Sequence, residues 1–145
     1  MYVQDILARK GRKVYKIQED ATVFDAIGTM SRHNVGSLLV TVGPRLKGII
    51  SDRDYRDKVI LKGRTSRETL VKEIMTPDPI TVGLNDSIDV CMAIMTEKKI
   101  RHLPVLDGYH IEGVVSIGDM VKAIIDRQKI EIDDLKKYII GSYPG

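Results

Sequence analysis

The sequence predicts an α+β fold built from two copies of one β-α-β-β-α unit. Shifted by 65 positions, residues 17–55 align with residues 82–120 without a gap. Identical residues recur at equivalent places, including the pairs Met30/Met95, Leu38/Leu103, Val40/Val105, Gly43/Gly108, Gly48/Gly113, Ser51/Ser116 and Asp54/Asp119. The 145-residue chain fits one compact domain, whereas each half alone buries too little surface to be stable. We therefore expect the two copies to pack together.

The first elements of each copy are a short strand and an amphipathic helix. Residues 15–17 and 80–82 are the predicted strands. Apolar residues then follow at i, i+3, i+4 and i+7, from Val23 to Met30 in one copy and from Ile88 to Met95 in the other, which predicts one apolar stripe on a helix. Thr22 and Ser87 precede these stripes, and we expect both to act as N-caps.

A β-hairpin and a second helix complete each copy. Two β-rich runs surround a turn signal in each case, at residues 37–50 with Gly43-Pro44 and at residues 103–115 with Asp107-Gly108. Ser51 and Ser116 then open the second helices. Their apolar positions are Tyr55, Val59 and Ile60 in the first copy and Met120, Ala123 and Ile124 in the second.

The remaining segments connect and extend the copies. Residues 70–75 predict a short helix that the following prolines end. Residues 126–140 predict a terminal helix with a narrow apolar face, which packs on the module or on a partner. The expected divisions are an N-terminal segment at 1–13, a first repeat at 14–62, a linker at 63–78, a second repeat at 79–126, and a C-terminal helix and tail at 127–145.

Composition is that of an ordinary globular protein, with 43% hydrophobic and 30% charged residues interleaved. No apolar run approaches the length of a bilayer span, and the N-terminus lacks a signal-peptide pattern, so a cytoplasmic protein is expected. The single cysteine, Cys91, lies in an amphipathic pattern and is expected to be a buried structural thiol. A basic cluster near the N-terminus is either a phosphate-facing patch or a solvated surface; it comprises Arg9, Lys10, Arg12, Lys13 and Lys16.

The chemistry-bearing motif is Ser-x-x-Asp, which occurs at residues 51–54 and again at 116–119. Each copy lies at a strand-to-helix junction, where free backbone N–H groups and the helix dipole attract an anion such as phosphate. The same pattern also forms a capping box that satisfies the chain's own donors. Lys99, Arg101 and His102 precede a strand of the other copy, and a carboxylate beside such cations suits a nucleotide.

Taken together, these features resemble the CBS domain pair, named after cystathionine β-synthase. The resemblance rests on the duplicated unit, the linker Glu-Ile-Met-Thr-Pro at 73–77, the run Ile-Arg-His-Leu-Pro-Val at 100–105, and the paired Gly-Ile-Ile-Ser and Gly-Val-Val-Ser junctions. It covers about residues 14–126. The resemblance implies two repeats packed sheet to sheet with pseudo-twofold symmetry, two clefts that commonly bind adenine nucleotides, and dimers formed through the second helices.

Carried over residue by residue, the resemblance implies one better-equipped cleft. Asp54 would contact the ribose and Ser51 the ribose or phosphate, with Arg53 beside them as a possible phosphate contact. Residues along the base would be Thr81 and Val82, with Pro104 on the adjoining strand, and Lys99, Arg101 and His102 would face the phosphates. The symmetric cleft would use Lys16, Ile17, Asn34, Gly36, Ser37, Ser116 and Asp119. Because it carries less positive charge, we expect unequal occupancy.

No residues combine into a catalytic set or a metal-ligand spacing, so we expect neither an enzyme nor a resident metal or required cofactor. The predicted function is that of a stand-alone regulatory module that senses AMP, ADP or ATP through conformation or partner binding, with any Mg2+ arriving together with ATP. Three alternatives stay open: a dimerisation scaffold with vestigial clefts, a binder of another adenosyl ligand such as NAD or S-adenosylmethionine, and a nucleic-acid binder. A homodimer would be supported by exposure of Tyr55, Val59 and Met120 or Ile124. This holds both for the nucleotide-sensing module and for the dimerisation scaffold.

Overall fold

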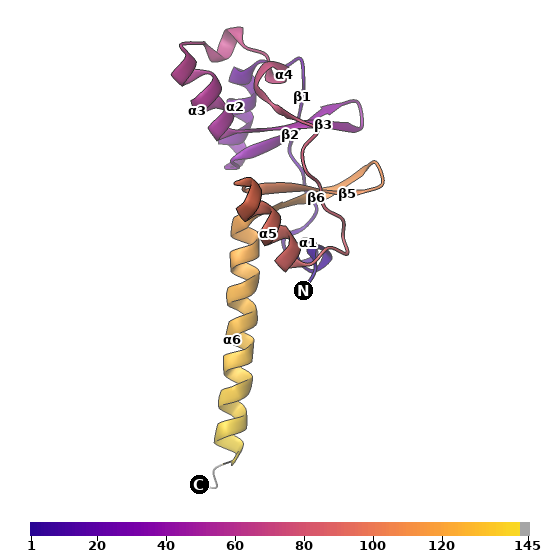
Figure 1. The fold of residues 1–145 in the computed structure, drawn as a ribbon, viewed down its shortest axis with the longest axis vertical. Helices are drawn as coiled ribbons and strands as arrows, with labels where there is room; N and C mark the ends of the chain where they lie inside the picture. The colour runs from indigo at the N-terminus through magenta and orange to yellow at the C-terminus, as the bar shows by residue number, and fades with distance from the viewer. Residues whose placement is uncertain (143–145) are drawn as a thin grey trace.

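The computed structural model describes residues 1–142 and shows two stacked lobes, one for each repeat, with a long helix running away from the second lobe (Figure 1). Each lobe has its own hydrophobic core. The predicted α+β architecture of two similar units is confirmed.

The first lobe contains a four-stranded sheet in the order β1-β2-β3-β4. Strand β1 pairs with β2 in parallel, whereas the β2/β3 and β3/β4 pairs are antiparallel. The strands are β1 (Lys16–Gln18), β2 (Ser37–Val42), β3 (Arg45–Ser51) and β4 (Thr76–Pro77). The helices are α2 (Val23–His33), α3 (Asp52–Lys58) and α4 (Val71–Ile74), with 3-10 turns η1 (Ile60–Lys62) and η2 (Ser66–Glu68) between α3 and α4.

The second lobe repeats this plan with a smaller sheet. Its elements are α5 (Ile88–Lys98), β5 (His102–Asp107), β6 (His110–Ser116) and α6 (Ile117–Ser142). The strand predicted at residues 80–82 is wrong, because that segment makes only one isolated bridge, between Val82 and Val105, where the first lobe has β1. The predicted N-caps are confirmed: the Thr22 hydroxyl accepts a hydrogen bond from the Asp25 N–H at 3.1 Å, and Ser87 does the same for Val90 at 3.1 Å.

Helix α6 is a single element of 26 residues. The second helix of the second repeat and the terminal helix predicted from residue 126 are therefore one continuous helix. No proline or glycine interrupts residues 119–140, so nothing in the sequence forces a break there. The last three residues of the predicted tail, 143–145, lie outside the described residues.

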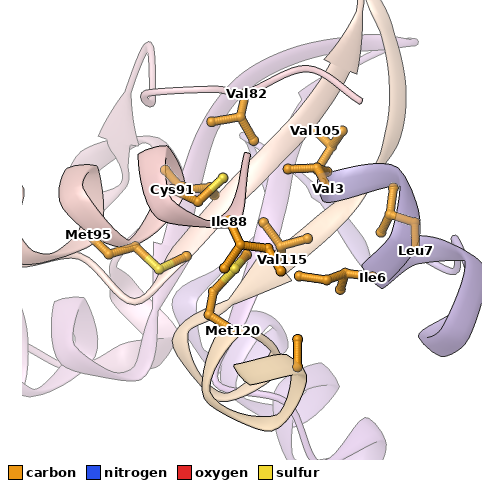
Figure 2. Close-up of a cluster of buried hydrophobic side chains, with 12 residues drawn as sticks. Val3, Ile6, Leu7, Val82, Ile88, Cys91, Met95, Val105, Val115 and Met120 are labelled. Carbon is orange, nitrogen blue, oxygen red and sulfur yellow. The ribbon is translucent and has the colours of Figure 1, made fainter. Parts of the chain in front are cut away.

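The two lobes exchange a helix. Helix α1 (Val3–Lys10) precedes the first repeat but packs into the core of the second, where Val3, Ile6 and Leu7 join the buried side chains (Figure 2). Helix α4 precedes the second repeat but packs into the core of the first. Equivalent backbone hydrogen bonds fix the two helices, from the Val3 N–H to the Asp86 carbonyl at 2.9 Å and from the Val71 N–H to the Ala21 carbonyl at 2.8 Å. The N-terminal segment and the linker are thus parts of the two cores.

The sheets of the two lobes face each other (Figure 1). Leu38 and Val40 of β2 belong to the core of the first lobe, so Leu39 and Thr41 point to the opposite face of the strand. These two residues are nevertheless only 1% exposed. The second face of the sheet is therefore covered as well, as sheet-to-sheet packing requires.

Candidate functional site

A cavity of about 340 Å³ opens where the two repeats meet. Six of the predicted site residues line it: Ser51, Arg53, Asp54, Lys99, Arg101 and His102. The first three come from the β3–α3 junction of the first repeat, and the other three from the α5–β5 junction of the second. The volume lies at the lower end of the range of small-molecule sites. One repeat thus supplies a carboxylate and the other supplies the cations.

Asp54 is held in place by a capping box at the start of α3. Its Oδ2 accepts a hydrogen bond from the Ser51 N–H at 2.9 Å, while the Ser51 hydroxyl lies 3.3 Å from both the Asp54 N–H and Oδ2. The other oxygen, Oδ1, pairs with Lys58 at 3.0 Å, and Lys58 also donates to the Ile74 carbonyl at 2.8 Å. The Ser-x-x-Asp motif therefore caps the helix and at the same time presents a fixed carboxylate at the cavity.

The opposite wall is basic. Lys99 ends α5 in the left-handed conformation, with φ of 56°, and this turn brings the chain into β5. Arg101 crosses between the repeats and pairs with Asp52 at 2.9 Å. A guanidinium held by one carboxylate keeps further N–H donors for a second anion, since it has five in all.

His102 follows Arg101 and is the first residue of β5. Burial lowers the pKa of His102 below its ordinary value, and the charge of Arg101 lowers it further. A Cβ added to Gly36 would lie 3.7 Å from His102 Cε1 and 3.6 Å from Asp52 Oδ2, so Gly36 approaches the same place from the other repeat. The two junctions meet there.

Three predicted residues do not line this cavity. The Val82 side chain is 5% exposed and packs in the second core, Pro104 is buried on β5, and Thr81 is exposed. The cavity is instead completed by residues that the sequence did not single out: Ile49, Asp57, Thr76, Asp78, Pro79, Ile80 and Ile100. Strand alternation could have indicated Ile49, because its neighbour Ile50 is fully buried. Thr76 and Asp78 could not be found this way, because β4 must first be placed beside β3.

The symmetric cleft is built differently. Ser116 and Asp119 form the same capping box, with the Ser116 N–H donating to Asp119 Oδ2 at 2.8 Å and the Asp119 N–H donating to the Ser116 hydroxyl at 3.1 Å. Lys10 of α1 binds the same Asp119 oxygen at 2.8 Å and donates to the Val114 carbonyl at 2.9 Å. Each motif carboxylate is thus paired with a lysine, Asp119 with Lys10 of another element and Asp54 with Lys58 of its own helix.

Other residues predicted for the symmetric cleft remain apart from Asp119. Asp119 lines a cavity of about 180 Å³ whose other lining residues come from α1 and α6: Ile6, Arg9, Lys10, Lys122, Ala123 and Asp126. The predicted contributors from the first repeat do not line it; they are Lys16, Ile17, Asn34, Gly36 and Ser37. Ile17 packs against the core of the first lobe, and Asn34 ends α2 with φ of 52°. The position equivalent to Lys99 is thus an uncharged amide.

The basic cluster near the N-terminus is largely paired with carboxylates of the second repeat. Arg9 lies 3.5 Å from Asp126, Lys10 binds Asp119, and Arg12 binds Glu112. These contacts favour a structural role for α1, which they anchor to β6 and α6.

Two residues expected at an exposed dimer surface are core residues instead. Val59 and Met120 are both fully buried, one in each hydrophobic core, so the expectation that they are exposed is wrong. Tyr55 and Ile124 are partly buried. The exposed apolar positions of this region are Ile60 at 53%, Leu61 at 69%, Val121 at 45% and Ile125 at 46%.

Cys91 is a buried thiol, and burial raises its pKa to about 11. Within residues 1–142, no three His, Cys, Asp or Glu side chains gather in a way that could hold a metal ion. None of the helices in this part of the chain has the length and apolar character needed to cross a membrane.

Comparison with known proteins gives a consistent result over both repeats. The CBS domain model matches residues 3–60 and 71–126. The mitochondrial CBS domain-containing protein CBSX3 of Arabidopsis thaliana is 39% identical over 151 residues, which cover 97% of this chain and 73% of the plant protein. A solved protein with CBS domains from Burkholderia ambifaria MC40-6 is 45% identical, with a TM-score of 0.86 over 88% of this chain and 96% of that chain.

A more distant structure contains a ligand. The CBS domain protein PAE2072 of Pyrobaculum aerophilum, solved in complex with AMP, has a TM-score of 0.74 at 24% identity, over 82% of this chain and 89% of that chain. At that identity the likeness is one of fold.

Proposed function

Because the chain belongs to the CBS domain family, we propose that it is a regulatory module that binds one adenine nucleotide in the cavity between Asp54 and Arg101. The observation that carries this proposal is the pairing of a fixed carboxylate from one repeat with cations from the other around a single cavity. The AMP complex of a protein with the same fold supports the choice of ligand class.

Each wall of the cavity has a separate role in the proposal. Asp54 accepts a hydrogen bond from a ribose hydroxyl on Oδ1, where the contact with Lys58 leaves one lone-pair direction free. Lys99, Arg101 and His102 neutralise phosphate charge, and the base lies against the apolar side chains of Ile49, Ile80 and Ile100. Arg53 stands beside Asp54, whereas Gly118 holds the equivalent position in the second repeat.

The proposed output is a change of geometry between the repeats, which alters binding to a partner protein. Ligand and switch are coupled because the cavity takes residues from both repeats, so closing on the nucleotide fixes their relative position. A differential affinity of about 1.4 kcal/mol between two arrangements shifts their ratio tenfold. The module acts without catalysis in this proposal, and AMP, ADP and ATP compete for the cavity as a measure of cellular energy.

A matched pair of variants tests the site. Asp54→Ala and Asp119→Ala remove equivalent capping boxes, so both lose similar helix-capping energy, about 1 kcal/mol. Only Asp54→Ala should weaken AMP, by roughly 10-fold to 100-fold, since a hydrogen bond to a charged group is worth about 1.5–3 kcal/mol. Isothermal titration calorimetry measures the affinities, and thermal unfolding confirms that both variants fold.

A third variant tests the phosphate wall. Arg101→Ala should lower the affinity for ATP more than the affinity for adenosine, because adenosine has no phosphate that Arg101 could contact. Equal losses for both ligands would contradict this role. If AMP, ADP, ATP, NAD and S-adenosylmethionine all leave the wild-type unfolding temperature unchanged, the nucleotide proposal fails and the dimerisation scaffold takes its place. Binding to polynucleotide that weakens steeply with salt would instead indicate a nucleic-acid binder.

A further inference from the structure

One exposed apolar stripe on α6 follows a heptad pattern. Its positions are Val121, Ile125, Gln128, Ile132, Leu135 and Ile139, separated by alternating steps of four and three residues. Such spacing places the side chains along one seam of a helix, with Ile125, Ile132 and Ile139 at the a positions and Val121, Gln128 and Leu135 at the d positions. The seam therefore extends over most of α6.

The apolar seam residues are accessible to solvent. Their exposed fractions are 45% for Val121, 46% for Ile125, 51% for Ile132, 58% for Leu135 and 46% for Ile139. The helix runs beyond the second lobe, so its distal half has no neighbouring element in the part of the chain that the structure describes (Figure 1). A regular apolar seam that stays exposed along a protruding helix marks an interaction surface.

We propose that this seam pairs with the α6 seam of a second copy of the chain, as a parallel two-stranded coiled coil in register. Ile at the a positions with Leu at a d position favours two strands. The flanking charges select the direction. Glu131 lies at a g position and Lys136 at the following e position, so parallel copies place Glu131 of each helix beside Lys136 of the other. Antiparallel copies would bring Lys129 and Lys136, both at e positions, together.

Gln128 sets the register. It is the one polar residue on the seam between Val121 and Ile139, and in-register pairing places it opposite Gln128 of the second copy, where the two amides can hydrogen-bond. A shift by one heptad would bury it against Val121 or Leu135 without a partner. The pairing thus differs from a dimer made only by the second helices of the repeats, although Val121 and Ile125 join the two surfaces.

Two neighbouring isoleucines provide a matched test. Ile132 is on the seam, whereas Ile130, which is 55% exposed, lies at an f position on the outer side of the helix. Ile132→Glu should raise the dimer dissociation constant at least tenfold in analytical ultracentrifugation of the full chain, and Ile130→Glu should leave it within twofold of wild type. A wild-type chain that stays monomeric at 100 μM, or equal effects of the two variants, would overturn the proposal. Thermal unfolding checks that both variants retain the folded module.

Cysteine cross-linking tests direction and register. Gln128→Cys places a thiol opposite its own copy in the second chain, while the native Cys91 is buried. Mild oxidation should convert most of this variant to a disulfide-linked dimer, and Ile130→Cys should cross-link at least tenfold more slowly. Equal rates for the two variants, or no cross-link for Gln128→Cys under conditions where wild type is dimeric, would exclude parallel in-register pairing. Neither outcome depends on nucleotide binding.

Discussion

At the scale of single residues, His102 connects the charge of the cavity to pH. Its imidazole lies between the repeats, and burial and Arg101 both lower its pKa. Asp52 and Asp119 act in the opposite direction, and Lys10 adds to the lowering. Both cavity walls and the symmetric cleft therefore influence this one side chain.

We expect the lowered pKa of His102 to make stability depend on pH. An unfolded chain binds a proton near the ordinary pKa of 6.5, whereas the folded chain binds it only at lower pH. Above pH 6.5 His102 is neutral in both the folded and the unfolded state, so it causes no loss of stability there. As pH falls through 6.5 toward the folded-state pKa, the unfolded state binds more protons and stability decreases.

Thermal unfolding at pH 7.5 and pH 5.5 measures this loss in wild type and in His102→Asn. The variant should lose less stability over the interval than wild type does. An identical difference in unfolding temperature would show that other groups carry the acid sensitivity. Because a bound phosphate favours the protonated imidazole, ATP should also reduce the loss in wild type.

At the scale of secondary-structure elements, close packing explains why both repeats have a glycine at the equivalent positions Gly48 and Gly113. Strand β3 pairs with β4 at this point, with Gly48 opposite Pro77. A Cβ added to Gly48 would lie 2.8 Å from the Thr76 carbonyl oxygen and 2.7 Å from Met75 Sδ. Its equivalent, Gly113, is approached in the same way by Leu7 of α1, at 2.8 Å. Both glycines thus make room for the exchanged helical segments.

Gly48→Ala should therefore destabilise the protein by about 1–3 kcal/mol, the usual cost of overpacking, because the obstructing atom is partly backbone. Gly36→Ala is the matched control, since its Cβ would meet only ordinary contacts of 3.6 Å and 3.7 Å. Urea unfolding of both variants measures the difference. Equal stability of the two variants would show that β4 moves aside without loss.

The exchanged helices also show where sequence prediction stops. The helices, hairpins and caps of the repeats follow from local periodicity and from the 65-residue shift, and they were correctly predicted. The 65-residue shift does not reveal that α1 and α4 are equivalent, because these helices repeat at a shift of 68. At that shift Val3, Ile6 and Leu7 match Val71, Ile74 and Met75. Which core each helix enters depends on long-range packing, which no local pattern encodes.

The same limit applies to the cavity. Motif residues such as Asp54 and Arg101 were identifiable because they lie at element junctions that the sequence predicts. Their neighbours Thr76 and Asp78 line the cavity only because β4 adds to the sheet beside β3. The sequence predicts weaker ligand binding in the second cleft because this cleft lacks the Arg and the His. The contact between Lys10 and Asp119 could not be predicted, since it depends on where α1 packs.

At the scale of the whole molecule, pseudo-symmetry is broken at three equivalent pairs of positions. Where the first repeat has Asn34, Gly36 and Ser37, the second has Lys99, Arg101 and His102. In addition, Asp54 lines a cavity of about 340 Å³ that takes residues from both repeats, whereas Asp119 lines one of about 180 Å³ bounded by α1 and α6. Charge and space therefore favour the same cleft.

One adenine nucleotide per chain is the expected stoichiometry. Isothermal titration calorimetry with AMP measures it directly, and Asp119→Ala should leave the number at one. Two equal sites per chain would contradict the asymmetry described above. A second, much weaker event at high ligand concentration would agree with it, because the symmetric cleft retains its own Ser116 and Asp119 cap.

The continuity of α6 has a mechanical consequence. Its first turn carries the Asp119 cap next to the symmetric cleft, and the same rigid rod continues for 26 residues. At 1.5 Å per residue the rod is about 39 Å long, so a tilt of about 5° at its base moves its tip by roughly 3 Å. A rotation of the second repeat too small to break a hydrogen bond is thereby magnified into a displacement close to an atomic diameter. In the proposed switch, the helix would act as a lever whose far end moves with the angle between the repeats.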